Sequence, residues 1–215
     1  MTRKGGSGLA ELTPLFVDMR SRRIIVFGGG QVALRKCCHV KDSEMTVVAP
    51  NILSELRRMS VELVEAEIDV SDAKWMMYGF DMVIAATDSK DINNRIRDVA
   101  KSAGIPVNSA HGGGDVLFPS ILSRKDYTVA VSSNGNMPAF PPFLVEELDG
   151  ILDESFDNLL EFMIIVRREY SAKWDQNKRS EFYKRILRNH QIRELTSSGN
   201  INSAIELARE LGESV

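Results

Sequence analysis

Three consecutive glycines, Gly28–Gly30, constrain the fold of this chain more than any other feature of its sequence. They follow the short apolar run 23–27, and the residues from 31 to 41 that come next contain neither glycine nor proline. This order is typical of a strand, a tight turn and a helix. With Ala33, the glycines fit the pattern G-x-G-x-x-A, which is found where a backbone turn approaches the pyrophosphate of a dinucleotide.

Each position of this pattern has a physical task. The first glycine permits the tight turn, the second permits close approach of the pyrophosphate, and the small third residue lets the helix pack closely on the strand. The N–H groups and the positive end of the helix then hold the phosphates. A glycine turn can be purely structural, but its place between a strand and a helix favours dinucleotide binding. The residues expected to bind the cofactor here are Gly28, Gly30, Gln31, Val32 and Ala33.

Strands and helices alternate beyond this turn. Apolar or alternating runs predict further strands at 45–49, 61–68, 82–86 and 105–108, and helical spacing predicts helices at 52–59, 72–78 and 91–103. Repeated strand–helix alternation indicates a parallel sheet covered on both faces. We therefore expect an α/β fold with a Rossmann-type, doubly wound parallel sheet.

The pattern changes after the glycine-rich loop 111–115. Two runs, 118–123 and 127–132, predict a β-hairpin, and helices are expected at 143–148, 155–170, 178–195 and 201–211. Pro141 and Pro142 are expected to delay the first of these helices. The predicted division is a flexible N-terminal tail (1–12), a nucleotide-binding domain (13–115), a hairpin segment (116–149) and a small C-terminal helical domain (150–215).

Three more residues are candidates for cofactor contacts. A Rossmann fold usually places Asp or Glu about 20 residues after the glycine turn, where it contacts the ribose. This sequence has Asn51 there, which could bind the ribose hydroxyl, although an asparagine before a helix is more often its N-cap. The choice between NAD and NADP is therefore open at this point. Thr87 and Asp88 follow the strand 82–86, where sheet ligands bind, and capping of the next helix is the alternative for both.

Composition and charge exclude several partners. Lys and Arg number 27 and Asp and Glu number 30, which gives a net charge of −3 and no general attraction for nucleic acid or an acidic membrane. The chain has no long apolar span and no secretory signal pattern. Cys37 and Cys38 are adjacent, which does not fit a disulfide framework. We expect a cytoplasmic protein in which both cysteines act as small packing residues.

Other chemistries lack their motifs. No tyrosine is followed by a lysine four residues later, as a short-chain dehydrogenase would require. The loop from His111 to Gly114 is not accompanied by a G-x-S-x-G nucleophile elbow, which disfavours an esterase. The three histidines are scattered, and H-E-x-x-H, C-x-x-C and P-loop patterns do not occur, so no metal ligands are predicted.

The order and spacing of seven segments resemble the precorrin-2 dehydrogenase family, which includes bifunctional siroheme synthases. The resemblance runs from about Thr13 to Asp149. The segments that carry it are Pro14–Phe16, Gly28–Gly30 with Val32–Lys36, Val48–Pro50, Ile84–Asp88 with Asn93, Val107–Asn108, Phe118–Ile121 and Val129–Ser133.

This resemblance implies a homodimer that binds NAD. The substrate would be precorrin-2, a small-molecule tetrapyrrole, which NAD oxidises to sirohydrochlorin while the protein supplies orientation, electrostatics and proton removal. Two alternatives stay open. The same site could also insert iron as a ferrochelatase, or the chain could be a catalytically weak protein that binds NAD or a tetrapyrrole.

The resemblance also implies site residues. Family members typically carry an aspartate three residues after the asparagine that is Asn108 here, but this chain has His111. An imidazole changes its charge near neutral pH and could accept a proton, so His111 and nearby Asp115 are the catalytic candidates, with a purely structural loop as the alternative. Asn108, Ser132, Ser133 and Asn134 match the substrate pocket, although the last three also suit an ordinary turn.

Overall fold

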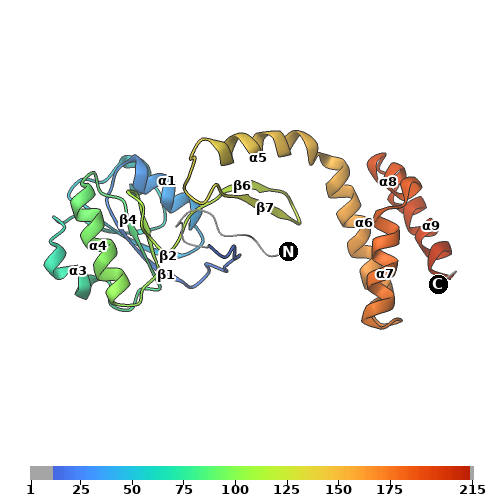
Figure 1. The fold of residues 1–215 in the computed structure, drawn as a ribbon, viewed down its shortest axis with the longest axis horizontal. Coiled ribbons are helices and arrows are strands. Elements are labelled where there is room, and N and C mark those ends of the chain that lie inside the picture. The colour runs from blue at the N-terminus through green and yellow to red at the C-terminus, as the bar shows by residue number, and fades with distance from the viewer. Residues whose placement is uncertain (1–11, 214–215) are drawn as a thin grey trace. The chain divides into compact units, whose positions relative to one another are not determined.

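The computed structural model describes residues 12–213, except for the side chains of 70–72 (Figure 1). The described chain forms two compact units. The first extends to Phe118 and includes Asn134–Asn136, and the second comprises Pro119–Ser133 and the residues from Met137 onward. Apart from Leu12, the tail predicted over residues 1–12 lies outside the described residues.

The first unit contains a five-stranded sheet of order β3-β2-β1-β4-β5, in which every neighbouring pair is parallel. The prediction of a Rossmann-type parallel sheet is thus confirmed. The strands are β1 (Arg23–Phe27), β2 (Glu44–Val48), β3 (Glu62–Val64), β4 (Met82–Ala85) and β5 (Val107–Ser109). The helices are α1 (Gln31–His39), α2 (Ser54–Arg57), α3 (Val70–Met76) and α4 (Lys90–Ser102).

Alternation of side chains along β1 explains why both faces of the sheet are buried. Ile24 and Val26 pack with residues of α1 and α2 on one face, while Ile25 and Phe27 pack with residues of α3 and α4 on the other. A strand covered on both sides reads as a continuous apolar run, as 23–27 does. The chain order reverses between β1 and β4, so the carboxyl ends of these strands flank the switch point of the sheet.

The second unit begins with an antiparallel hairpin, as predicted. It comprises β6 (Ser120–Ser123) and β7 (Thr128–Val131), followed by α5 (Phe140–Ile151). The Arg124 guanidinium at the hairpin turn donates to Asp149 Oδ1 and to Leu152 O, both at 2.8 Å, which ties the turn to the carboxyl end of α5. The prediction that two prolines delay this helix was wrong: α5 already includes Pro141 and Pro142, because first-turn residues need no N–H donor.

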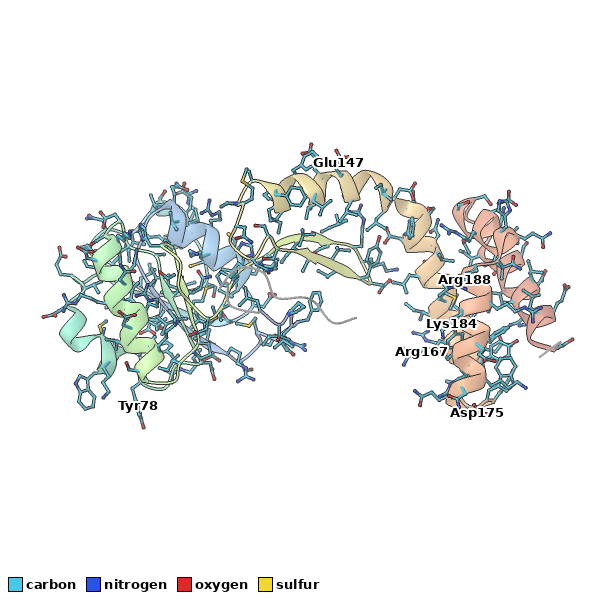
Figure 2. All side chains as sticks on the ribbon, viewed as in Figure 1. Tyr78, Glu147, Arg167, Asp175, Lys184 and Arg188 are labelled. Atoms are coloured by element: carbon cyan, nitrogen blue, oxygen red, sulfur yellow. The ribbon has the colours of Figure 1, made fainter. Side chains whose placement is uncertain are left out.

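The remaining helices are α6 (Glu154–Tyr170), α7 (Gln176–Leu187), α8 (His190–Ser197) and α9 (Ile201–Glu213). One long helix at 178–195 was predicted, but the structure has two helices, α7 and α8, in this region. Asn189 lies between them, and its side chain caps α8 by accepting from Ile192 N at 3.0 Å. Figure 2 shows Asp175 at the start of α7, where its carboxylate accepts from Asn177 N and Lys178 N. A boundary was predicted between the hairpin segment, which ends at Asp149, and the helical domain that follows it. In the structure, the residues on both sides of Asp149 belong to the second compact unit.

These helices enclose a core of their own, which is centred on the aromatic side chains Phe162, Tyr170 and Phe182. Phe162 and Phe182 are almost fully buried, and the ring centroids of Tyr170 and Phe182 lie 5.0 Å apart. The unit therefore has the apolar contacts of an independent core. Among residues 12–213, none of the helices combines the length and the apolar character needed to cross a membrane.

Candidate active site

A cavity of about 420 Å³ opens in the first unit where β1, β2 and β4 end. This edge of a doubly wound sheet is where ligands bind. Seven of the eight predicted cofactor residues line the cavity: Gly28, Gly30, Gln31, Val32, Asn51, Thr87 and Asp88. The eighth, Ala33, is buried. The other residues that line the cavity are Gly29, Ala49, Pro50, Glu67, Ile68, Ala86 and Ile92.

The glycine turn leaves space where a pyrophosphate would need it. Gly28 has φ +121°, and a Cβ added there would lie 2.2 Å from Ala86 O, so only glycine fits. At Gly30 the opposite holds: an added Cβ would meet no atom within 4 Å. The backbone at Gly30 is thus open to the cavity that it lines, which fits the close approach of a phosphate group.

The start of α1 is suited to hold an anion. Gly30 is the N-cap residue, no side chain caps the helix, and its first turn contains no acidic residue. No side chain of the first turn therefore competes with an anion for these N–H groups or for the positive end of the helix dipole. Ala33 packs in the core between α1 and the sheet, in accordance with the third position of the glycine pattern.

Asn51 and Glu67 both line the cavity. Asn51 does not cap α2, because the N-cap position belongs to Leu53. Glu67 was not predicted, since it follows β3 and the Rossmann pattern places the acidic residue after the second strand. The sequence indicates Glu67 only as a carboxylate that follows β3, the strand that pairs with β2. Among the described lining residues, none is lysine or arginine.

Thr87 connects the cavity to the buried Asn93 on α4. Thr87 N and Thr87 Oγ1 each lie 2.9 Å from Asn93 Oδ1, and Asn93 Nδ2 donates to Thr87 O at 2.9 Å. Helix capping, the alternative role for Thr87 and Asp88, belongs to Ser89, whose Oγ accepts from Ile92 N at 3.3 Å. Asn93 was noted in the sequence only as part of a family pattern, because its burial and partners depend on the folded chain.

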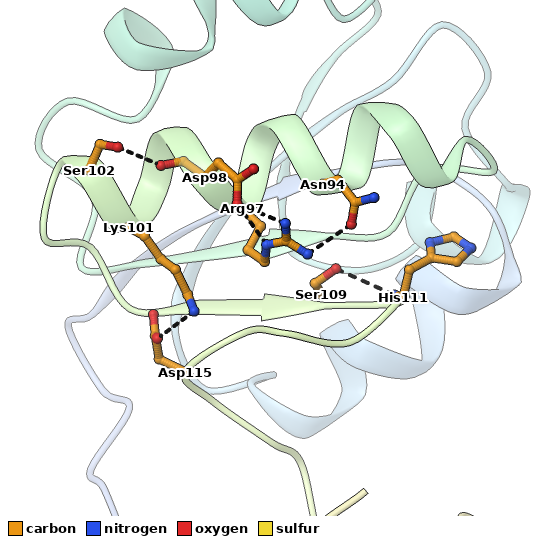
Figure 3. Close-up of polar contacts among 8 residues, drawn as sticks. All are labelled: Asn94, Arg97, Asp98, Lys101, Ser102, Ser109, His111 and Asp115. Carbon is orange, nitrogen blue, oxygen red and sulfur yellow. Dashed lines mark hydrogen bonds and ion pairs between the residues drawn. The ribbon is translucent and has the colours of Figure 1, made fainter. Parts of the chain in front are cut away.

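His111 lies beside Asn93 and follows β5. Its Nδ1 atom is 2.9 Å from Asn93 Nδ2. Its backbone N–H group points to Ser109 Oγ at 3.4 Å (Figure 3). The glycine loop then returns closely along β5, since a Cβ at Gly114 would lie 2.3 Å from Val107 O. Asn93 therefore contacts both His111 and Thr87, and Thr87 lines the cavity.

Asp115, the second catalytic candidate, is not brought together with His111. Its carboxylate forms an ion pair with Lys101 at 3.2 Å, near the carboxyl end of α4, whereas His111 lies near the amino-terminal half of that helix (Figure 3). The backbone N–H of Asp115 donates to Val107 O at 2.8 Å, at the start of β5. The loop thus spans the length of the strand and separates the two side chains.

Asn108 is buried in β5, and both ends of its amide have partners. Its Oδ1 accepts from Lys36 Nζ, and its Nδ2 donates to Val116 O at 2.8 Å. Lys36 also lies 5.7 Å from the centroid of the Phe118 ring. Burial, and then the positive charge of Arg35, lowers the pKa of Lys36. Asn108 therefore holds a partly desolvated ammonium group that sequence reasoning had not singled out.

The serine and asparagine candidates follow β7. Ser133 Oγ donates to Met137 O at 2.9 Å and accepts from Met137 N at 3.2 Å, which closes a local turn. Asn134 has φ +55°, a left-handed conformation that asparagine tolerates in turns. These contacts fit the turn alternative for Ser133 and Asn134; Ser132 lies just beyond the end of β7.

The part of the chain that forms this cavity resembles known nucleotide-binding proteins. Residues 15–120 match the model of a family described as "Putative NAD(P)-binding". A siroheme synthase of Psychrobacter cryohalolentis is 30% identical over 197 residues, which cover 89% of this chain and 38% of that protein. A siroheme synthase of Pseudomonas paraeruginosa is 34% identical over 157 residues, covering 69% of this chain and 33% of that protein. The chain thus spans little more than a third of the length of these relatives.

The solved structure named "SirC, precorrin-2 dehydrogenase" has the same fold. It matches with a TM-score of 0.70 at 20% identity, and the match covers 93% of this chain and 100% of that one. The sequence match to the Psychrobacter protein likewise extends beyond the nucleotide-binding region into the C-terminal helices. Because sequence and fold agree over most of its length, the chain belongs to the family of precorrin-2 dehydrogenases and siroheme synthases.

Proposed function

We propose that this protein oxidises precorrin-2 to sirohydrochlorin with NAD as the electron acceptor. The observation that carries the proposal is the cavity at the switch point of the sheet, where Gly28 has no room for a side chain and Gly30 is open to a ligand. The names of the siroheme synthase relatives and of the SirC structure supply the substrate class.

The residues of the cavity divide the work of binding. Gly30, Gln31 and Val32 offer backbone N–H groups for the pyrophosphate, and Thr87 and Asp88 form the rim beyond β4. These residues would hold NAD, which would supply the hydride acceptor, and the macrocycle would release one proton to complete its loss of two hydrogens. The protein's own task is to orient the two molecules and to stabilise the charges that change.

The proposed cofactor is NAD rather than NADP. A 2′-phosphate is recognised by a cation such as arginine, but the described lining residues include two carboxylates, Glu67 and Asp88, and no lysine or arginine. A phosphate beside Glu67 would be repelled, whereas the ribose hydroxyls of NAD could donate hydrogen bonds to that carboxylate. Asn51 offers a further polar contact in the same cavity.

The cofactor preference can be reversed by a single change. Glu67→Arg is expected to weaken NAD binding and strengthen NADP binding, each by roughly tenfold, because a repulsive charge becomes an attractive one. Titration of both nucleotides by fluorescence or calorimetry measures this. Glu44→Arg, which makes the same charge change at the start of β2, is the matched control. If the wild-type protein prefers NADP, the proposed role of Glu67 is wrong.

The activity itself is tested with purified protein, precorrin-2 and NAD. We expect NADH to appear together with sirohydrochlorin, and both can be followed by absorbance. Cofactor binding without either product would contradict the dehydrogenase and would favour a protein that only binds NAD or a tetrapyrrole. The assay is run with and without ferrous iron, so that metal insertion is recorded as a separate step.

We also propose a cytoplasmic homodimer. In the second unit, Ile121 on the hairpin and Phe140 and Phe143 on α5 are 44%, 51% and 54% exposed, which is unusual for large apolar side chains of one segment. Cys37 and Cys38 are both free thiols, as is normal in a reducing compartment. Light scattering of the purified protein determines its mass, and a monomer at micromolar concentration would contradict the dimer.

A further inference from the structure

Asn93 connects the cofactor cavity to the loop that carries His111. Its side chain is 0% exposed, and all of its hydrogen-bonding groups have partners: Thr87 N, Thr87 Oγ1, Thr87 O and His111 Nδ1, each at 2.9 Å. A buried amide with four such contacts is held in one orientation. Its position therefore governs the side chain of His111.

The backbone of Thr87 determines which way the Asn93 amide points. The N–H group of Thr87 can only donate, so the atom that it faces is the oxygen Oδ1. The carbonyl of Thr87 can only accept, so the atom beside it is the nitrogen Nδ2. Rotating the amide by half a turn would place donor against donor and acceptor against acceptor.

This orientation also determines the tautomer of His111. The second hydrogen of Asn93 Nδ2 points toward His111 Nδ1, which must accept it with a lone pair. A neutral imidazole that accepts at Nδ1 carries its proton on Nε2. A proton on Nδ1 would face the amide N–H and leave a buried donor without an acceptor, which is costly.

The charged side chains near the loop already have partners. Arg97 on α4 donates to Asn94 Oδ1 at 2.8 Å and to Asp98 Oδ1 at 2.9 Å (Figure 3). Asp115 forms its ion pair with Lys101 farther along the helix. Within the described part of the chain, no hydrogen bond or ion pair engages His111 Nε2, and His111 is an exposed residue.

We propose that Asn93 is a positioning residue that holds the neutral form of the His111 ring with its proton on Nε2, so that this Nε2–H group donates a hydrogen bond to a carboxylate of the substrate. The choice of a carboxylate as the acceptor rests on the proposed function, because the tetrapyrrole substrate has eight carboxylates. The inferred tautomer of His111 does not depend on the substrate. The inference also means that His111 does not take up the proton released in the oxidation, because its basic nitrogen already accepts from Asn93.

The tautomer can be measured without substrate. In ¹⁵N-labelled protein, long-range proton–nitrogen spectra distinguish a protonated ring nitrogen from one with a free lone pair, and His111→Gln assigns the signals. We expect His111 to be protonated at Nε2 only. In Asn93→Asp, a carboxylate replaces the amide donor and should draw the proton to Nδ1. Asn94→Asp, the same change one residue along α4, should leave the tautomer as it is.

Two spectroscopic results would overturn the proposal. One is a proton on Nδ1 of His111 in the wild-type protein at neutral pH, and the other is an unchanged tautomer in an Asn93→Asp protein that still binds NAD. If Asn93→Asp does not fold, the wild-type spectrum and the kinetic comparison below still decide. His190, whose ring lies 3.4 Å from a Glu194 carboxylate oxygen, provides an internal comparison in the same spectra.

Kinetics separate a hydrogen-bond donor from a proton acceptor. His111→Gln keeps an N–H donor but no basic group, whereas His111→Asp keeps a basic group but no donor. A donor to a substrate carboxylate acts on binding, so His111→Asp should raise KM roughly tenfold and His111→Gln should stay within about threefold of wild type. A base would instead show a fall in kcat of about 10²-fold or more in His111→Gln.

The experiments distinguish a failure of the proposed function from a failure of the proposed donor role of His111. A protein that does not oxidise precorrin-2 contradicts the proposed function, and the spectra still test Asn93 and His111. An active enzyme in which His111→Gln loses kcat while His111→Asp retains it contradicts the donor role and returns His111 to proton transfer.

Discussion

Gly28 and Gly30, two glycines of the same turn, differ in the space that surrounds them. At Gly28 an added methyl group would collide with the backbone at Ala86, while at Gly30 it would meet open space beside the cavity. The sequence pattern assigns the tight turn to Gly28 and the approach of a pyrophosphate to Gly30, and the space around each residue fits this division. We therefore expect a side chain at Gly28 to disturb the fold and one at Gly30 to disturb ligand binding.

Two alanine substitutions test this separation. Gly30→Ala should weaken NAD binding by roughly tenfold without changing stability, because the methyl group occupies space that a phosphate needs. Gly28→Ala should destabilise the first unit by more than about 1–3 kcal/mol, since strain at positive φ adds to the collision. Urea unfolding and NAD titration measure the two effects. Equal losses of stability in both variants would contradict the assignment.

The two cysteines of α1 also differ at this scale. Cys37 is fully buried in the core and Cys38 is exposed. A thiol reagent at about pH 8 should therefore modify Cys38 rapidly and Cys37 only after unfolding, because the reactive thiolate of a buried cysteine hardly forms. In Cys38→Ser protein, the rate of labelling then reports opening of the first unit. Rapid modification of two thiols in the folded protein would show that the core around Cys37 is open.

Cys37 further predicts sensitivity to alkali. Burial raises the pKa of its thiol from 9.0 to about 11. In the unfolded chain the thiol ionises first, so stability that is present below pH 9 should decrease as the pH rises toward 11. Chemical unfolding across this range measures the change. Cys37→Ala, which cannot ionise, should remove this part of the pH dependence.

Among the elements, those governed by local patterns were predicted best. The apolar run 23–27 became β1, and the five-strand alternation gave the right sheet. The start of α5 was misjudged, because proline lacks a donor but the first turn of a helix does not need one. The break between α7 and α8 was missed, because charged residues with no glycine or proline on either side of Asn189 continue a helical pattern.

The cap at Asn189 gives an element-level prediction. Asn189→Ala should lower the free energy of unfolding of the second unit by about 0.5–2 kcal/mol, because Ile192 N loses its acceptor. Asn189→Asp retains a side-chain oxygen and should be nearly neutral. Thermal or urea unfolding followed by circular dichroism compares the variants. If alanine and aspartate behave alike, the cap does not stabilise α8.

The candidate site was predictable only where it depends on chain order. The glycine turn, Asn51, Thr87 and Asp88 follow strands that end at one edge, so their joint position in the cavity could be anticipated. Glu67 could not, because its strand lies at the edge of the sheet and carries no glycine pattern. Asp115 and His111 are near in sequence yet separated in space, because a strand's length lies between the ends of their loop.

At the scale of the whole molecule, two units have separate cores. Phe182→Ala should remove about 3–5 kcal/mol from the second unit, because a fully buried ring leaves a cavity behind. Hydrogen exchange should accelerate in α6–α9, whereas exchange in the β1–β4 sheet and the affinity for NAD should stay unchanged. Faster exchange in both units would show that the chain unfolds as one cooperative body.

The inward face of position 111 has a consequence for how such sequences diverge. Asn93 offers an N–H group that the His111 imidazole accepts in the proposed tautomer, and a carboxylate at this position would accept it equally well. Histidine and aspartate codons differ by one nucleotide. A single mutation that gives His111→Asp would therefore exchange an outward donor for an outward acceptor while the buried amide keeps its partner, so the chemistry offered to a ligand can change while the fold is retained.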